Sequence, residues 1–396
     1  MAIETKYPEF VQVLKNNQIP TTEEEIHLIF DNEVKAQGSL INNDPKYSPF
    51  WRLITSIIKK PYFWLLSFLV NTVLPQSFVK TSSGLFLDLY LQSVNLKRKS
   101  ASKAQGFVIF ERELGAPEIL LPAGFTISTD RINDTIYQLI IPIETTLPAN
   151  AVSIKVDCIA ANTGGGFNLS GGYYCIPQTP LPGLLRVHNP DDWLSVPGAD
   201  TEKDSDAKER YRAQFTAASG WYIDDKYKLI MSEFGGVKAD QIYIEKNAPR
   251  GPGTANAYLL LDSGTASAPF LTAINHAIRV DGYHGLGDDM LTQALPEKFI
   301  SIDLEVLFIP NIDTDEIEKV KHNIEQYIRC VFRENQAYPL AMKTWPLTLF
   351  SFSTLNQELR NTFNQIASLY FVNRDFRMAM EIARIQQLTI TDMPHA

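Results

Sequence analysis

Cysteine is scarce in this sequence. The 396 residues include three, Cys158, Cys175 and Cys330, which are far apart and odd in number. They lack the close spacing of metal ligands, so neither a disulfide framework nor a cluster of zinc-binding thiols is expected. We expect reduced, mostly buried thiols in a protein made in the cytosol.

Histidine is also scarce, and the common catalytic signatures are missing. The six are His27, His188, His276, His284, His322 and His395. None lies in a His-Glu-x-x-His pattern or in a spacing typical of a triad. His284 lies near Asp288 and Asp289, which leaves a metal site open, but an exposed loop histidine is the favoured interpretation. With no Gly-x-Ser-x-Gly and no nucleotide-binding glycine pattern, we predict no catalytic, cofactor-binding or metal-binding residues.

No apolar run in the sequence is long enough to cross a bilayer. The best candidate is residues 62–74, YFWLLSFLVNTVL, bounded by Pro61 and Pro75. A helix of that length reaches roughly 20 Å, against a hydrocarbon core of roughly 30 Å. Lys59 and Lys60 stand directly upstream. We therefore expect a helix that is buried or packs on partner chains, with no membrane insertion.

Positive charge is not in excess. The chain carries 36 Lys and Arg against 45 Asp and Glu, a formal net charge of −9, which argues against a dominant nucleic-acid surface. The start, MAIETKYPEF, also lacks the pattern of a signal peptide. One basic patch, Lys97, Arg98, Lys99 and Lys103, could bind an acidic partner or nucleic acid. A solvated hinge or a contact between subunits is favoured.

The patterns that are present predict an α+β protein of several domains. Residues 1–104 form an N-terminal helical region, in which Glu23, Glu24 and Glu25 follow Thr21 and Thr22 as at a helix start. Residues 105–190 contain short β-rich runs separated by turns, typical of a small antiparallel β domain. Helices and strands alternate afterwards, which predicts α/β sandwich-type domains at 191–310 and 311–396.

The expected elements of the later domains can be given by residue number. We predict helices at 204–218, 223–234, 269–280, 313–332 and 352–365, and strands at 241–246, 255–262, 300–309, 368–372 and 385–391. Gly235 and Gly236 are expected to end the second of these helices. The run 85–96 is ambiguous between helix and strand.

Two connecting segments stand out. The glycine-rich stretch 162–172, NTGGGFNLSGG, could cradle phosphate. It lacks a following Gly-Lys-Ser/Thr and a helix pattern, so a tight loop is favoured. Pro177, Pro180 and Pro182 hold the link 176–197 extended. We expect hinges at this link and at residues 97–105.

The stretch 187–215 is rich in acids, which could form a metal site, a catalytic cluster or a helix start. The acids are Asp191, Asp192, Asp200, Glu202, Asp204, Asp206 and Glu209. The helix start is favoured, with Asp204 as the N-cap and Thr201 as a second candidate. Ala207, Tyr211 and Phe215 then form an apolar stripe, and Asp204–Lys208 and Asp206–Arg210 are acid-before-base pairs. The alternating acids of a calcium loop are absent.

The same stretch carries a family resemblance. The run NP…GADTEKD…RYR, followed by a helix, a glycine and another helix, resembles the Baseplate J-like family, the wedge proteins of contractile phage tails and related injection particles. NLKRKSASKAQGFVIF, LPAGFTIST, TPLPGLLRVHNP and FGGVKADQIYIEKNAPRGPGTANAYLLLD resemble further motifs of that family, in order along the chain. The resemblance covers about residues 85–392, although 281–299 lacks the expected Arg-Pro element.

The residues that carry the resemblance are expected to be structural and are called the motif residues below. They are Arg98, Gly106, Pro122, Gly124, Pro182, Gly183, Asn189, Pro190, Gly198, Ala199, Asp200, Glu202, Asp204, Arg210, Gly236, Gly251, Pro252 and Gly253.

The resemblance implies a structural wedge protein of the virion tail baseplate, made in the host cytoplasm, and not an enzyme. Two copies in different conformations would join a smaller wedge protein that binds the N-terminal helices, and residues 311–396 would serve as a dimerisation region. Six wedges would close a ring around the central hub and spike, next to a sheath-initiator-like protein. This ring would transmit the change that triggers sheath contraction. The resemblance does not distinguish a phage from a tailocin or a secretion-type injector.

Two other classes remain open. A tail-associated receptor- or glycan-binding protein would predict a repetitive β-rich C-terminal region with aromatic-lined loops, which the alternation of helix and strand disfavours. An enzyme that acts on the cell wall would need paired carboxylates in a cleft or zinc ligands.

Overall fold

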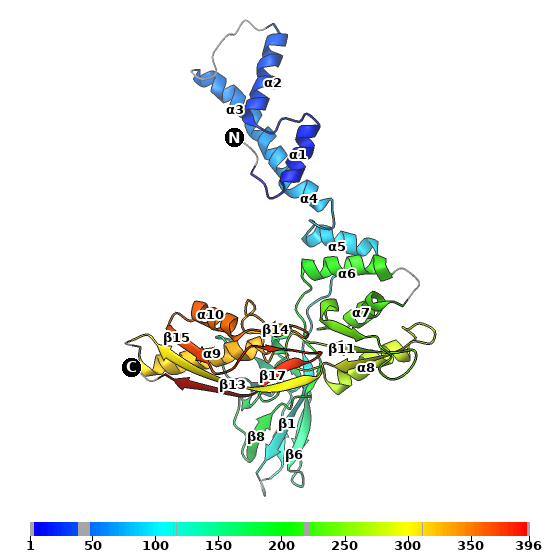
Figure 1. Cartoon of the computed structure of the whole chain (residues 1–396), viewed down its shortest axis with the longest axis vertical. Helices are drawn as coiled ribbons and strands as arrows, with labels where there is room; N and C mark the ends of the chain where they lie inside the picture. Colours follow the sequence, from blue (N-terminus) through cyan, green and yellow to red (C-terminus); the bar gives the residue numbers. More distant parts are fainter. Residues whose placement is uncertain are drawn as a thin grey trace. The chain divides into compact units, whose positions relative to one another are not determined.

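The chain forms two compact units. The computed structural model describes residues 4–38, 48–113, 115, 117–217, 222–310 and 312–393. The first unit comprises residues 1–98 and 203–212, and the second comprises residues 99–202 and 213–396 (Figure 1).

The first unit is helical. Its elements are α1 (Pro8–Asn16), α2 (Glu23–Ala36), α3 (Pro49–Phe68), the π-helical turn η1 (Leu69–Val73), α4 (Leu74–Gln76), α5 (Gly84–Ser93) and the first part of α6 (Asp204–Ala217). At the start of α2, the Thr22 hydroxyl accepts a hydrogen bond from Glu25 N–H, and the Glu25 carboxylate accepts one from Thr22 N–H. This capping box bears out the predicted helix start.

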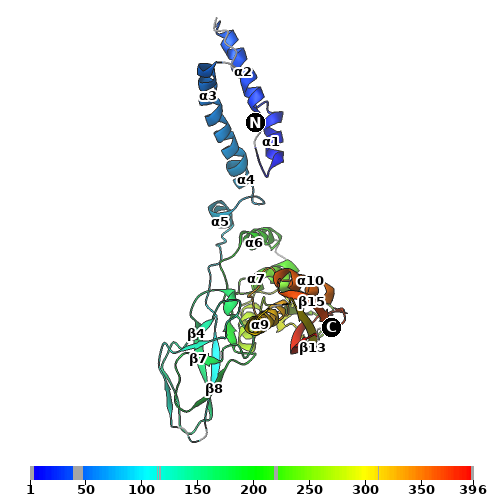
Figure 2. The ribbon, with the colours of Figure 1, turned by 90° about the vertical axis from the view of Figure 1, so that its left-hand side faces the viewer.

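The helices α1 and α2 lie along α3 (Figure 2). Leu14 of α1 packs against Leu66 and Val70, and the Tyr62 hydroxyl donates a hydrogen bond to the Pro20 carbonyl at 2.8 Å. These contacts involve one side of α3 and its continuation. The helical arm predicted for the N-terminal region is confirmed.

The apolar helix of this arm is longer than predicted. Pro61 lies inside α3, and α3, η1 and α4 follow one another without a break. The prediction of a short segment was wrong because it took Pro61 and the lysines before it as a helix boundary. By length and composition alone, the 25 residues Arg52–Gln76 could cross a membrane, and 17% of the apolar window is buried. Helices that pack on other proteins pass the same test.

The helices α5 and α6 pack on each other within the first unit. The ambiguous run 85–96 is largely helical, because α5 spans residues 84–93. Leu87 and Leu91 are fully buried in one cluster with Ala207, and Tyr211 packs against it. The first two positions of the predicted stripe are thus confirmed, and the side chain of Phe215 lies outside the described residues.

The second unit begins with a seven-stranded sheet of order β7-β3-β4-β6-β1-β8, in which β9 also pairs with β1. The strands are β1 (Gln105–Arg112), β3 (Thr126–Ser128), β4 (Gln138–Ile140), β6 (Ser153–Ala160), β7 (Ile176–Pro177), β8 (Leu184–His188) and β9 (Leu194–Val196), and β2 (Ile119–Leu121) pairs separately with β5 (Thr145–Leu147). All of these pairs are antiparallel. Alternate side chains of β1 are buried, as expected for a sheet with one face on a core.

The link 176–197 is part of this sheet. It contains β7, β8 and β9, and β8 and β9 both pair with β1. A hinge at this link does not fit the structure, because ladder hydrogen bonds hold it. The prolines keep the chain extended, as predicted, but between paired strands.

A second layer of the unit combines three strands with two helices. Its elements are α7 (Asp224–Ser232), the 3-10 turn η3 (Ala239–Gln241), β10 (Ile242–Glu245), β11 (Thr254–Leu259), α8 (Ala268–Arg279) and β12 (Asp289–Ala294). β11 pairs antiparallel with β10 and parallel with β12. β12 was not predicted. The helix α7 ends before the predicted glycines, and Gly236 instead has a φ of 80° in the turn that follows.

The C-terminal layer places two helices on one face of a sheet (Figure 1). Its elements are β13 (Glu297–Phe308), α9 (Thr314–Val331), β14 (Leu349–Phe350), α10 (Phe352–Thr362), β15 (Ile366–Phe371), β16 (Phe376–Arg377) and β17 (Ile382–Asp392). The sheet has the order β15-β13-β17, and Ile302, Leu304 and Val306 share its core with α9 and α10. The α+β fold class is confirmed, whereas the domain boundaries at 104, 190 and 310 remain a prediction.

Candidate functional site

The glycine-rich loop 162–172 lies inside the second unit. The Asn168 side chain donates to the Gly198 carbonyl at 2.8 Å and accepts from Gly198 N–H at 2.7 Å. The Asn168 carbonyl accepts from the Ser263 hydroxyl at 2.6 Å. Asn168 is 5% exposed, so these hydrogen bonds are shielded from water. The loop, which includes the 3-10 turn η2 (Gly165–Phe167), joins the β sheet to the helix–strand layers.

Two motif glycines allow this loop to pack. A Cβ atom at Gly198 would lie 2.5 Å from the Gly164 carbonyl oxygen and 2.9 Å from the Ala104 nitrogen. A Cβ at Gly106 would overlap the backbone oxygen of Trp193, whose indole N–H donates to the Leu169 carbonyl at 2.8 Å. Backbone atoms cannot move aside as a side chain can, so both positions require glycine.

The motif residue Asn189 holds the other end of the loop in place through hydrogen bonds. The Asn189 side chain accepts from Tyr174 N–H at 2.9 Å and donates to the Ser170 carbonyl at 2.9 Å. Its own carbonyl accepts from Gly172 N–H at 2.7 Å. Asn189 is buried, and all of these bonds hold backbone groups in place.

The Pro-Ala-Gly and Pro-Gly motifs form tight turns. Phe125 N–H donates to the Pro122 carbonyl at 3.1 Å, and Leu184 N–H donates to the Leu181 carbonyl at 3.2 Å. Gly124 and Gly183 follow the first central residue of each turn with φ of 86° and 81°. A positive φ at that position is typical of a type II turn and explains the glycines.

The Gly-Pro-Gly motif at residues 251–253 forms a turn clamped by its neighbour Arg250. The Arg250 guanidinium contacts the Asp289 carboxylate at 2.5 Å and the Asn256 side-chain oxygen at 3.0 Å. The hydrogen bond from Arg250 and its charge lower the pKa of Asp289. Asp289 also pairs with Arg279 at 3.0 Å, so its carboxylate is paired with two arginines.

His284 and Asp288, the other residues of the possible metal site, also make contacts within the protein. The His284 ring nitrogen contacts the Gly285 carbonyl at 2.8 Å, and Asp288 accepts from the Tyr227 hydroxyl at 3.0 Å. Across the described residues, no group of three or more His, Cys, Asp and Glu side chains could hold a metal ion. The contacts of loop 281–290 therefore brace it on α7.

Carboxylates of the acidic stretch accept hydrogen bonds from backbone N–H groups in both units. In the second unit, Asp200 accepts from Gly165 N–H at 3.4 Å, and Ala199 pairs with Ser102. The Glu202 carboxylate accepts from Lys99 N–H at 3.0 Å. Because the carboxylates of Asp200 and Glu202 accept hydrogen bonds from backbone N–H groups, these motif residues have a structural role.

In the first unit, Asp204 holds α5 and α6 together. It is the first residue of α6 rather than the predicted N-cap. Its carboxylate accepts from Gly84 N–H at 3.2 Å and pairs with Arg98 at 2.8 Å, not with Lys208. Arg98 also pairs with Asp88 at 2.7 Å.

The motif residue Arg210 of α6 also binds the segment that follows α5. The Arg210 guanidinium donates to the Lys97 carbonyl at 2.6 Å. The predicted helix start is therefore right, but Asp204 and Arg210 make their contacts with α5 and the segment that follows it rather than along α6.

Two arginines of the second unit are almost wholly buried. Arg333 stacks on Trp345 at 4.3 Å and donates to the Thr344 carbonyl at 2.8 Å. Burial lowers the pKa of Arg333 to about 10, although Asp262 opposes the shift. Arg384 donates to the Gly264 carbonyl at 2.7 Å and pairs with Glu297 at 2.9 Å. Both side chains tie loops to the end of α9.

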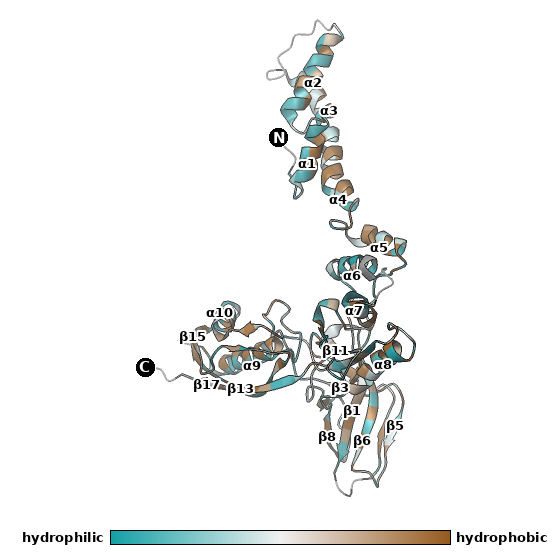
Figure 3. Cartoon of the chain, turned by 45° about the vertical axis from the view of Figure 1, so that its right-hand side comes forward, coloured by the Kyte–Doolittle hydropathy of each residue, from teal (hydrophilic) through white to brown (hydrophobic). Residues whose placement is uncertain are grey.

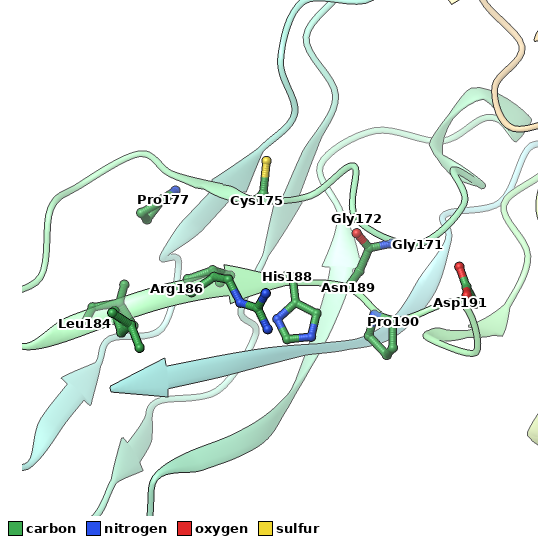
Figure 4. Close-up of a pocket in the computed structure, with 12 residues that line it drawn as sticks. Gly171, Gly172, Cys175, Pro177, Leu184, Arg186, His188, Asn189, Pro190 and Asp191 are labelled. Carbon is green, nitrogen blue, oxygen red and sulfur yellow. The ribbon is translucent and has the colours of Figure 1, made fainter. Parts of the chain in front are cut away.

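A groove of about 620 Å³ lies between β8 and residues 171–177 (Figure 4). Its Arg186 is paired with Glu111 at 2.8 Å. Figure 4 shows the Cys175 thiol pointing away from His188, and burial raises the pKa of that thiol. A thiol with a raised pKa is a poor nucleophile. Cys175 is exposed, whereas Cys158 and Cys330 are buried as expected.

The helical arm has an apolar surface of its own that faces outward. Phe50, Leu53, Ile57, Trp64 and Phe68 are exposed, the Trp64 side chain by 68%. We call these five residues the exposed stripe. They are three, four or seven residues apart, so they share the side of α3 opposite to Leu66 and Val70. Figure 3 shows the apolar character of this helix.

The comparison with known proteins gives a family. The chain is 40% identical over 342 residues to a protein of Haemophilus phage HP1 (strain HP1c1) whose name, baseplate protein gp29, assigns it to the baseplate; the match covers 86% of each chain. The chain belongs to this family of phage baseplate proteins. It is a structural component of the tail baseplate.

Two further comparisons with known proteins do not refine this family assignment. No family model matches the sequence of this baseplate protein. A chain in the cryo-EM structure of the anti-feeding prophage baseplate is similar at a TM-score of 0.34 and 10% identity, over 89% of both chains. The resemblance to the Baseplate J-like family thus continues to depend on the motif residues.

Sequence reasoning missed three structural features of the baseplate protein. Asn168 was part of a loop whose role was left open, and no spacing rule identifies a buried asparagine that pairs with one distant glycine. The burial of Arg333 and Arg384 likewise has no local signal. For the exposed stripe, the sequence predicted an apolar helix that is buried or packs on partner chains, but its continuation across Pro61 was missed because the proline was taken as a helix boundary.

Proposed function

We propose that this baseplate protein is a wedge protein of the Baseplate J-like type, which forms the inner ring of a contractile tail around the hub. The exposed stripe supports this proposal most directly. A soluble protein rarely leaves a row of large apolar side chains exposed on one helix unless another chain covers it. The second unit, by contrast, has three buried cores of its own.

The proposed partners are those that the resemblance to the Baseplate J-like family implies. A smaller wedge protein covers the helical arm, and a second copy of the chain joins the same wedge in another conformation. Six wedges, a sheath-initiator-like protein and the hub complete the assembly, without nucleic acid and without membrane insertion. The ring transmits the change that triggers sheath contraction.

Residues 311–396 are proposed to pair with their counterpart in the next copy. The strand β17 supports this, because it is the edge of its sheet in the described part of the chain and spans residues 382–392. Sheet edges of that length are usually covered or paired. Neither Pro nor Lys interrupts the edge.

A structural role without catalysis is part of the proposal. The motif residues with described side-chain contacts bind backbone groups or fixed charges, which is the work of a scaffold. An enzyme would instead present acid–base groups in a cleft. Incubation with peptidoglycan tests this point, and hydrolysis would contradict it.

The decisive experiment is the native mass of the chain alone and after co-expression with the products of its neighbouring genes. A complex of two copies with one smaller protein is expected. Deletion of residues 1–98 should abolish capture of the small protein but leave a folded second unit. A monomer that captures no neighbour would reject the wedge proposal and favour a receptor- or glycan-binding protein.

A further inference from the structure

One position on the same side of α3 as the exposed stripe is not apolar. Lys60 lies three residues after Ile57 and four before Trp64, so it shares their side of α3. With Phe50, Leu53 and Ile57, the stripe has the three-and-four spacing of a coiled-coil seam, and Lys60 occupies a position where the seam is normally apolar. The Lys60 side chain is exposed.

Lys60 has no partner within the described part of the chain. Neither an ion pair nor a hydrogen bond joins its ammonium group to another described residue. The adjacent Lys59 differs, because it faces α2. There a backbone hydrogen bond lowers the pKa of Glu24, and Lys59 contributes a smaller part of the same shift.

In the sequence around α3, the charge has one sign. From Asp44 to Asp88 the sequence contains no other acid. The cations of the same stretch are Lys46, Arg52, Lys59, Lys60 and Lys80. This is unusual in a chain with a net charge of −9. An apolar helix face that carries one lysine and no acid complements a helix that is apolar and acidic.

We propose that the exposed stripe is covered by an amphipathic helix of a partner protein that places a carboxylate opposite Lys60. This inference rests on the proposed function, because it names the chemistry of the proposed wedge partner. Covering the stripe would desolvate the Lys60 ammonium group, which is costly unless a carboxylate meets it. Two copies paired in parallel through the stripe would instead bring two lysines together, and lysine in a seam is known to select partner and register.

The test uses the full chain and three synthetic helices of about four heptads. The helices share a Leu/Ile seam and differ at one seam position, which holds Glu, Lys or Leu. Fluorescence anisotropy of the labelled helix measures binding. The Glu helix should bind at least about tenfold more tightly than the Lys helix. Lys60→Glu should reverse that preference.

Lys80→Glu is the matched control. It makes the same change of charge in the same acid-free stretch, on an exposed residue outside the stripe, and should keep the wild-type preference. Because Lys60 is exposed and makes no described contact, Lys60→Glu should fold normally, which circular dichroism checks. A third variant, Lys60→Leu, should favour the Leu helix.

Several results would overturn the proposal. Equal binding of the Glu and Lys helices is one, and an unchanged preference in Lys60→Glu is another. Self-association of the wild type that Trp64→Glu abolishes would assign the stripe to a second copy. Binding to anionic lipid vesicles but to none of the helices would assign it to a membrane.

The outcome can be separated from that of the proposed function. If a neighbouring gene product binds the arm equally well in the wild type and in Lys60→Glu, the wedge proposal stands and this inference fails. If the Glu helix is selected but no neighbouring product binds, the chemistry of the stripe stands and the wedge proposal fails.

Discussion

The two units use apolar side chains in opposite ways. In the second unit, residues such as Ile302, Leu355 and Val156 face shared cores, and Asn168 and Asn189 satisfy buried backbone groups. In the first unit, α3 buries a few side chains against α1 and leaves a row of larger ones exposed. The difference separates a part that encloses large shared cores from a part that leaves a continuous row of apolar side chains exposed, as is typical of a surface that another chain covers.

The largest effect should come from filling the space beside Gly198. Gly198→Val places a side chain against the backbone of residues 164 and 104, and we expect a loss of about 3 kcal/mol or more in the free energy of unfolding. Urea unfolding followed by tryptophan fluorescence measures it. Gly235→Ala is the control, because the atoms nearest to its Cβ would be 3.7 Å away. Equal stability of the two variants would contradict the tight packing of the loop.

The next effect should come from Asn168. Asn168→Ala removes both hydrogen bonds to Gly198 and leaves a buried N–H and a buried carbonyl without partners. We expect a loss of about 2–3 kcal/mol, again by urea unfolding. Asn162→Ala, in the same loop but exposed, should change stability by less than about 0.5 kcal/mol. A similar loss in both variants would assign the effect to the loop in general.

Substitutions in the exposed stripe of the helical arm should affect partner binding and leave stability almost unchanged. Trp64→Glu and Leu53→Glu change exposed residues, so we expect stability of the isolated chain within about 0.5 kcal/mol of the wild type. Capture of the smaller neighbouring protein, measured by co-purification, should be lost. Leu14→Glu should instead lower the stability of the isolated chain, because it disrupts the internal packing of the arm. Retained capture by Trp64→Glu would show that the stripe is not the contact.

The sequence predicted the elements better than it predicted how they are used. The helices α8, α9 and α10 and the strands β10, β13 and β17 were expected close to their observed positions, because each has a clear 3.6-residue or 2-residue period. The strand β12 was missed, since DMLTQA is short and mixed in polarity. Long-range partners have no such period, which is why the bonds of Asn168 could not be foreseen.

The failures in the first unit have a different physical cause. Pro61 was given the weight of a helix breaker, although a long apolar helix can continue past one proline. Asp204 was predicted to cap its own helix, whereas its carboxylate accepts a hydrogen bond from Gly84 N–H and pairs with Arg98. Local rules describe what a residue can do within its element, and tertiary packing decides which of these contacts forms.

The smallest effect should be the pH dependence contributed by Arg250 and Asp289. The Arg250 hydrogen bond lowers the pKa of Asp289 in the folded state. A carboxyl group with a depressed folded pKa stabilises the fold above its unfolded pKa of about 4, and this contribution is lost as the pH falls through the folded value. Urea unfolding of the wild type and Arg250→Gln at a series of pH values measures it. Their difference in stability should be largest near neutral pH and shrink below pH ~4. A difference that stays constant with pH would mean that Arg250 stabilises the turn through its other hydrogen bonds, to Asn256 and Ala255, rather than through the charge of Asp289.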